Sequence, residues 1–215
     1  MTDSPTGSAA RRRAIVVAGH TGDLATARSS LDDADPTVRA AGLAALERLG
    51  QLEDRMLVTA FGDESATVRR RAVLLAARRP HVSLQPLLGD ADTTVVEAAA
   101  WACGEHERVD DGTLGALIDL ATDADVPLVR EAAAAALGAI GDERGLPAIL
   151  QACDDKPQVR RRAVLALAPF DGDEVDAAID RALADRDWQV RQAAEDLRRA
   201  AGVVETGDAG DPSED

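Results

Sequence analysis

The stretch Asp32–Gly50 reads DDADPTVRAAGLAALERLG, and recognisable versions of it return five more times along the chain. One valine in each copy serves as a register mark, and these valines are Val38, Val68, Val95, Val129, Val159 and Val190. Successive marks are separated by 30, 27, 34, 30 and 31 residues. Periods of this length are typical of stacked supersecondary units, so the sequence predicts a repeat architecture.

Each mark begins an apolar stripe with a period of four. The residue four positions after the mark is never larger than alanine, and the six are Gly42, Ala72, Ala99, Ala133, Ala163 and Ala194. The residue eight positions after it is apolar in five copies and Arg198 in the sixth. These positions share one face of a helix, so the pattern predicts a helix whose backbone approaches a neighbour closely at the small residue. A polar residue in the last copy is typical of a terminal capping repeat.

Aspartate-rich turns precede the marks, as in Asp35-Pro36 before Val38. Aspartate accepts hydrogen bonds from the free N–H groups of a helix start, and proline suits the first turn. A shorter apolar segment lies ahead of each such turn, for example Leu114, Leu117, Ile118 and Ala121. Each repeat is therefore predicted to be a helix, a turn and a second helix.

The pattern D-x-x-V-R-x-x-A-x-x-A-L-G resembles the HEAT repeat, particularly the short version found in phycobilisome-lyase-like proteins. The best matches are Ala133, Ala136, Leu137, Gly138 and Ile140. The resemblance implies an all-α fold, a right-handed α-α superhelix (HEAT-repeat solenoid) of about six helical hairpins. RRRAIVVA at Arg11 also repeats RRRAVLLA at Arg69 and RRRAVLAL at Arg160, which indicates an N-terminal half-repeat with Ala14 in the small position. The pattern is specific for fold and not for activity.

Composition divides the chain into three parts. Residues 1–9 are polar and are expected to be disordered, residues 10–202 to form one continuous HEAT-repeat domain, and residues 203–215 to form an acidic disordered tail. The third repeat is irregular, because Val96 replaces the arginine that follows the mark elsewhere and a long charged connector, 104–112, follows. We expect curvature to change at that connector.

The charge balance is strongly acidic. The net charge is −15, and Lys156 is the only lysine among 24 basic residues, a composition that resembles the proteome of a salt-in halophile. Because the Debye length falls to about 3 Å in molar salt, we expect carboxylate repulsion to be screened there and the protein to loosen in low salt. Nucleic acid is a poor partner for such a chain, since backbone binding needs a basic footprint. The scarcity of aromatic residues also argues against a platform for stacking bases.

The N-terminal segment and the two cysteines indicate the cellular location of the protein and the redox state of its thiols. The six apolar residues after Arg11–Arg13 are too few for a secretory leader, so we expect a cytoplasmic protein without a membrane partner. Cys103 and Cys153 stand alone without a CxxC motif and are interpreted as reduced, buried, small apolar residues.

Two enzyme families share this type of repeat. Deoxyhypusine hydroxylase holds iron with His-Glu pairs, which makes His106-Glu107 a candidate. The family's ligand positions read Glu131-Ala132 after Arg130 and Arg161-Arg162 after Arg160, and no second His-Glu pair exists to complete a di-iron site. A bilin lyase is the other possibility, although no residue identifies a tetrapyrrole site. The sequence therefore predicts no catalytic residue, no cofactor and no metal, and an enzyme or enzyme subunit of either type stays the alternative.

Arginines follow the marks in five copies, at Arg39, Arg69, Arg130, Arg160 and Arg191. One interpretation is structural: each arginine bonds a cap aspartate of an adjacent repeat, for instance Arg69 with Asp35 or Arg160 with Asp125. The other is that the extra arginines Arg70, Arg71, Arg161 and Arg162 offer a basic strip to an acidic partner along the concave face. In a HEAT stack the second helices line that face.

Two tryptophans complete the candidate residues. Trp188 is interpreted either as packing over its turn or as an exposed anchor for a partner, and Trp101 lies off the apolar stripe of its helix. The sequence thus predicts a scaffold or adaptor that holds a peptide or protein through its concave face. The residues proposed for this contact are Arg70, Arg71, Trp101, Arg161, Arg162 and Trp188.

Overall fold

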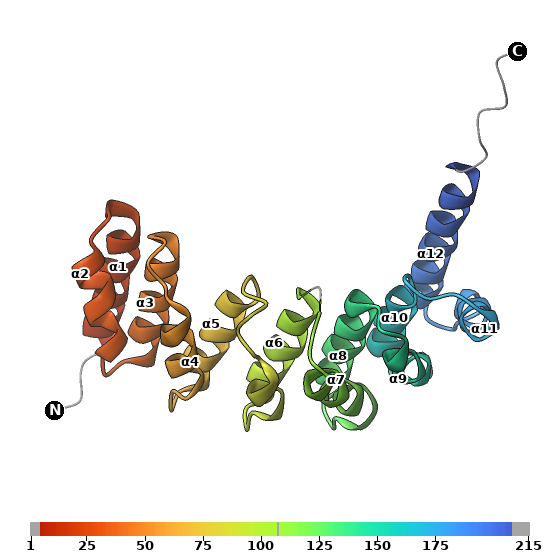
Figure 1. Cartoon of the computed structure of the whole chain (residues 1–215), viewed down its shortest axis with the longest axis horizontal. Coiled ribbons are helices and arrows are strands. Elements are labelled where there is room, and N and C mark those ends of the chain that lie inside the picture. Colours follow the sequence, from red (N-terminus) through yellow and green to blue (C-terminus); the bar gives the residue numbers. More distant parts are fainter. Residues whose placement is uncertain (1–4, 107, 208–215) are drawn as a thin grey trace, which may run out of the picture. The chain divides into compact units, whose positions relative to one another are not determined.

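The computed structural model describes residues 5–106 and 108–207, and every regular element among them is a helix (Figure 1). The chain divides into two compact units, Met1–Val109 and Asp110–Asp215, and the boundary lies inside the stretch 10–202 that is expected to form one continuous domain. Each unit is a stack of helical hairpins, as expected for the HEAT-repeat fold.

The first unit contains α1 (Pro5–Thr21), α2 (Leu24–Ser29) with η1 (Ser30–Asp32), α3 (Pro36–Arg48), α4 (Asp54–Phe61), α5 (Ala66–Ala76), η2 (Gln85–Gly89) and α6 (Thr93–Gly104). The second helices of the hairpins pack side by side, with α3 between α1 and α5, and α5 next to α6. The first helices α2 and α4 and the 3-10 helix η2 each pack on the second helix that follows. The third repeat therefore has only one 3-10 segment where the other repeats have an α-helix.

The second unit contains α7 (Asp111–Asp123), α8 (Pro127–Ile140), η3 (Glu143–Gly145), α9 (Leu146–Ala152), α10 (Pro157–Ala166), α11 (Asp173–Leu183) and α12 (Trp188–Gly207). Here α10 packs between α8 and α12, and α7, α9 and α11 supply the first helices. Among the residues 5–106 and 108–207, five of the six predicted hairpins consist of two α-helices, and the third pairs the 3-10 helix η2 with α6.

The predicted register is confirmed by burial. All six marks and all six small positions are buried, whereas Arg198, the polar residue of the last copy, is exposed. The small positions are small because neighbours are close: a Cβ added to Gly42 would lie 2.1 Å from Oγ of Ser30. A second close contact recurs one helix turn further on, where a Cβ on Gly138 of α8 would lie 2.6 Å from Cα of Ala166 on α10.

Helix α1 stands in the register of a second helix, which confirms the N-terminal half-repeat. A Cβ on Gly19 would lie 3.0 Å from Cα of Ala45, in the same positions as Gly138 and Ala166. Ala14, however, is exposed rather than buried, because α1 is the first helix of the stack, and its main neighbours are α2 and α3. Helix α1 begins at Pro5, inside the stretch expected to be disordered. Helix α12 runs to Gly207, past residue 203, and the rest of the expected tail, 208–215, lies outside the described residues.

Candidate interaction surface

The arginine after the mark is a clamp that joins consecutive repeats within each unit. Its Nε and Nη2 atoms donate to both oxygens of an aspartate in the turn of the following repeat. These pairs are Arg39 with Asp63, Arg69 with Asp90, Arg130 with Asp155 and Arg160 with Asp185, at 2.5–2.9 Å. The Nη1 atom donates to backbone carbonyls of the turn just before its own helix, such as Asp63 O for Arg69. Arg11 makes the same pair with Asp33 from the half-repeat.

The structural interpretation of these arginines is therefore confirmed, but the direction proposed for the bonds was wrong. Arg69 contacts Asp90 and not Asp35, and Arg160 contacts Asp185 and not Asp125. The guanidinium extends from the start of one second helix toward the turn that follows it. The partner is consequently in the next repeat along the chain.

The clamp also sets the protonation of its aspartates. The hydrogen bond from Arg160 holds the pKa of Asp185 below its usual value, and Arg69 and Arg130 do the same for the pKa values of Asp90 and Asp155. Three of the clamp aspartates, Asp63, Asp90 and Asp185, also accept a backbone N–H two residues on. Each of these carboxylates thus accepts a hydrogen bond within its own turn and also binds the arginine of the preceding repeat.

At one step along the sequence, both residues of the clamp are replaced by apolar residues. Val96 stands in the arginine position of the third repeat, and Ala124 stands in the aspartate position of the fourth. The chain divides into its two units between these residues, after Val109. The last clamp of the first unit is Arg69 with Asp90, and the first of the second unit is Arg130 with Asp155.

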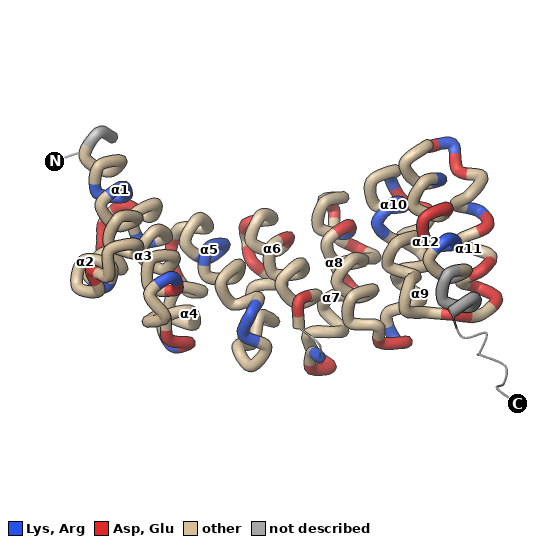
Figure 2. The backbone as a smooth tube through the Cα atoms, turned by 90° about the horizontal axis from the view of Figure 1, so that it is seen from above, with Lys and Arg blue, Asp and Glu red and all other residues tan. Residues whose placement is uncertain are grey.

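The arginines that follow the clamp residue, Arg70, Arg71, Arg161 and Arg162, take no part in a clamp. Arg70 and Arg71 are exposed on α5, where Arg70 has one loose contact with Glu97 at 3.8 Å and Arg71 has no ion pair among the described residues. Arg161 and Arg162 are half-buried on α10, and Arg162 lies 3.7 Å from Glu131. Basic residues are visible on α1, α5 and α10 (Figure 2).

The same surface pattern occurs in both units. The helix with two free arginines also carries a leucine one turn further on, Leu74 on α5 and Leu165 on α10. The second helix before it presents half-buried alanines at the equivalent positions: Ala41 and Ala44 on α3, Ala132 and Ala135 on α8. We call the positions two, three and six residues after each mark the second-helix face; in both units they are mostly exposed or half-buried, whereas Ala40, Ala98 and Ala193 are buried.

The two tryptophans are both exposed. Trp101 lies on the second-helix face of α6 and is 44% exposed. Trp188 is 65% exposed at the first position of α12, so the interpretation that it packs over its turn was wrong. The structure brings Arg70, Arg71 and Trp101 onto one face of the first unit, and Arg161 and Arg162 onto the corresponding face of the second. Trp188 lies at the end of its helix rather than on this face.

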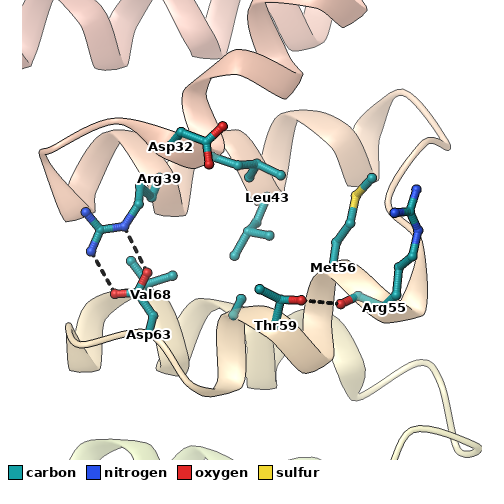
Figure 3. Close-up of a pocket in the computed structure, with 10 residues that line it drawn as sticks. Asp32, Arg39, Leu43, Arg55, Met56, Thr59, Asp63 and Val68 are labelled. Atoms are coloured by element: carbon teal, nitrogen blue, oxygen red, sulfur yellow. Dashed lines mark hydrogen bonds and ion pairs between the residues drawn. The ribbon is translucent and has the colours of Figure 1, made fainter.

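Sequence reasoning missed a pocket between the first two repeats of the first unit, shown in Figure 3. It has a volume of about 260 Å³ and is lined by Leu31, Asp32, Arg39, Leu43, Arg55, Met56, Thr59, Ala60, Asp63 and Val68. The ion pair of Arg39 and Asp63 closes one end, and Met56 and Arg55 of α4 lie at the other (Figure 3). We call it the repeat 1–2 pocket. No sequence motif marks it, because its walls come from four separate segments.

The residues considered for metal or redox chemistry have other surroundings. His106 is buried with Nε2 3.3 Å from the carbonyl oxygen of Ala76, and Glu107 lies outside the described residues. The described residues contain no group of three or more His, Cys, Asp or Glu placed to hold a metal ion. Cys103 is buried as expected, whereas Cys153 is half-buried, with its thiol pKa raised to about 12 by burial and then by the charge of Asp154. Among the described helices, none has the length and apolar character to cross a membrane.

Comparison with known proteins agrees with this geometry. A family model described as HEAT repeats matches residues 53–137, 82–168 and 127–198, which together span more than half of the chain. No curated protein sequence matches the chain significantly. The match is to HEAT repeats in general, so the phycobilisome-lyase-like type stays a hypothesis.

Solved structures with a similar fold include designed armadillo repeat proteins. A designed armadillo repeat protein in complex with the peptide (KR)4 has a TM-score of 0.61 at 19% identity, over 82% of this chain and 98% of the other. A second designed armadillo repeat protein has a TM-score of 0.57 at 17% identity, over 82% and 99%. An engineered protein has a TM-score of 0.57 at 19% identity, over 86% and 97%. At these identities the likeness shows the fold alone.

Proposed function

Because the chain belongs to the HEAT-repeat family, we propose that it is a scaffold or adaptor that holds an acidic segment of a protein partner on its second-helix face. One observation carries the proposal. Of three consecutive arginines at 69–71 and at 160–162, the first is used in a clamp, and the next two are exposed in the first unit and half-buried in the second. A fold that needed only its clamps would not require the second and third arginine in either unit.

The face also offers apolar contact. In the first unit the exposed ring of Trp101 stands on α6, and α5 beside it carries Leu74. Trp and Arg are the side chains most enriched among residues that dominate binding energy in protein interfaces. Helix α3 presents small alanines between the arginines of α1 (Arg12, Arg13) and those of α5, which leaves space for a bound segment. The designed armadillo repeat protein that binds (KR)4 supports peptide binding as a use of this fold.

We propose that the protein has no catalytic activity of its own and works in the cytoplasm. The second-helix face supplies contact area and charge, and the described residues contain no group of three or more His, Cys, Asp or Glu placed to hold a metal ion. Purified protein that carried iron or a pigment in a fixed ratio would overturn this part of the proposal and favour an enzyme.

The test is binding of a fluorescent Asp/Glu-rich peptide that contains leucines. The double variant Arg70→Glu/Arg71→Glu is expected to weaken binding about tenfold, since two exposed charges are reversed. The control Arg144→Glu/Arg186→Glu makes the same charge change away from the second-helix face and should bind nearly as well as the unmodified protein. Equal losses in the two double variants would show that only net charge matters and would overturn the proposed site.

A further inference from the structure

We propose that the repeat 1–2 pocket is a second docking site, which takes a lysine or arginine side chain from a basic protein partner. This inference goes beyond the proposed function, because the pocket lies on a different surface. Arg39 and Leu43 of α3 line it, whereas the second-helix face of the same helix is formed by Ala41 and Ala44. Two sites of opposite polarity would let one molecule bring two partners together.

The size and the floor of the pocket suit a long side chain. Leu43 and Val68 are almost completely buried beneath it, and Met56 of α4 forms a wall (Figure 3). A volume of about 260 Å³ is below the range of about 300–1,000 Å³ of pockets that enclose drug-sized ligands. A single aliphatic stem fits this space better than a larger cofactor.

The charges of the lining leave one carboxylate uncompensated. Arg39 is neutralised by Asp63 in the clamp, and Arg55 pairs with Glu53 at 2.7 Å. Asp32 is exposed on the rim and forms no hydrogen bond or ion pair with another described residue. Lysine and arginine bury their methylene stems along apolar surface and keep the charged end in water. The stem would therefore cover Leu43 and Met56 while the cation meets Asp32.

The second unit holds an internal control. A pocket in the corresponding repeat positions is lined by Cys153, Asp154, Arg160, Ala178, Arg181, Ala182, Asp185 and Arg186. Asp154, one residue further along its turn than the place of Asp32, supplies the carboxylate here, but Arg181 and Arg186 bring positive charge to the lining, and Ala178 replaces the methionine wall. This pocket does not suit a cation, although the equivalent clamp, Arg160 with Asp185, also lines it.

The experiment uses the full chain and a short fluorescent peptide of alternating lysine and serine. We expect Asp32→Asn and Met56→Ala to weaken binding about threefold to tenfold each, and Asp154→Asn to change it by less than twofold. The peptide with acetylated lysines should lose the binding that depends on Asp32. The variant Arg70→Glu/Arg71→Glu should bind it at least as well as the unmodified protein, which separates this site from the second-helix face.

Two results would overturn the proposal. Equal losses for Asp32→Asn and Asp154→Asn would mean general attraction of a basic peptide to an acidic surface. Competition by free lysine at the same concentration as the peptide would mean a small-molecule site rather than docking of a protein. Thermal unfolding of each variant shows whether the fold is intact, since Asp32 has no structural partner to lose.

Discussion

Arg160 and Asp185 form a bidentate ion pair between consecutive repeats, with Nε to Oδ2 at 2.8 Å and Nη2 to Oδ1 at 2.7 Å. Only 7% of the arginine side chain and 14% of the aspartate side chain are exposed. The remaining nitrogen, Nη1, donates to the carbonyl oxygen of Asp155 at 2.8 Å. A single guanidinium therefore joins the turns before two successive second helices, which makes the pair a structural element of the stack.

Replacing this guanidinium should destabilise the protein even when the charge is kept. For Arg160→Lys we expect a loss of about 2 kcal/mol in the free energy of unfolding, because an ammonium cannot make the two parallel bonds to Asp185. Arg191→Lys is the control, since Arg191 donates to backbone carbonyls of its own turn and to no other group among the described residues. It should cost less than about 1 kcal/mol. Urea denaturation compares the two, and equal losses would contradict an inter-repeat role.

The clamps should make stability depend on acid pH. The pKa values of Asp90, Asp155 and Asp185 are lowered from 3.8 in the folded protein, chiefly by the hydrogen bonds from their arginines. Their stabilising contribution is therefore complete above the ordinary pKa of an aspartate and is lost as the pH falls through the lower folded values. Urea midpoints measured from pH 7 to pH 3 should decline mainly below pH 4. Asp185→Asn should show a smaller decline, and an unchanged pH profile would argue against the clamp.

A methyl group at Gly138 should separate two helices of the second unit. A Cβ there would lie 2.5–2.7 Å from the Cβ, Cα and carbonyl oxygen of Ala166, so Gly138→Ala should destabilise by about 1–3 kcal/mol. Gly115→Ala in α7 is the matched control, because nothing lies within 4 Å of its added Cβ. That change should stabilise the helix by about 0.5–1 kcal/mol. Calorimetry that ranked the two variants in the reverse order would contradict the packing.

Salt should raise the stability of the protein. The net charge of −15 produces self-repulsion that molar KCl screens, whereas the half-buried clamps are screened much less. We expect the melting temperature followed by circular dichroism to rise from dilute buffer to molar KCl. The halophilic interpretation depends on this rise, and a melt unaffected by KCl would remove it.

Cys153 should be an unreactive thiol in the folded protein. With its pKa raised to about 12 by burial, alkylation at pH 8 should be about a thousandfold slower than for an unhindered cysteine, because the thiolate is the reacting form. The variant Cys103→Ala isolates the Cys153 signal, and the same reaction in urea gives the reference rate. Fast labelling of the folded variant would mean that this thiol is accessible.

Most of the fold could be predicted from residue spacing. The six marks, the small positions and the polar end at Arg198 follow from the period of the apolar pattern, because burial selects side chains by size and polarity at each turn of a helix. The arginine pairs outside the clamps could also be predicted, since their places are offset from the buried stripe. The first segment of the third repeat could not, because η2 contains few residues and no helical period.

Periodicity by itself determined which face of every second helix is buried and that an arginine follows the mark in five of the six repeats. Only the tertiary structure decided that Arg69 reaches Asp90 rather than Asp35, that Trp188 faces solvent, and that four segments enclose the repeat 1–2 pocket. The physical reason is the sequence distance over which each feature is determined. An apolar stripe records the environment along one helix, whereas the partner of a long side chain depends on how consecutive repeats are offset, and that offset results from packing between residues distant in the sequence.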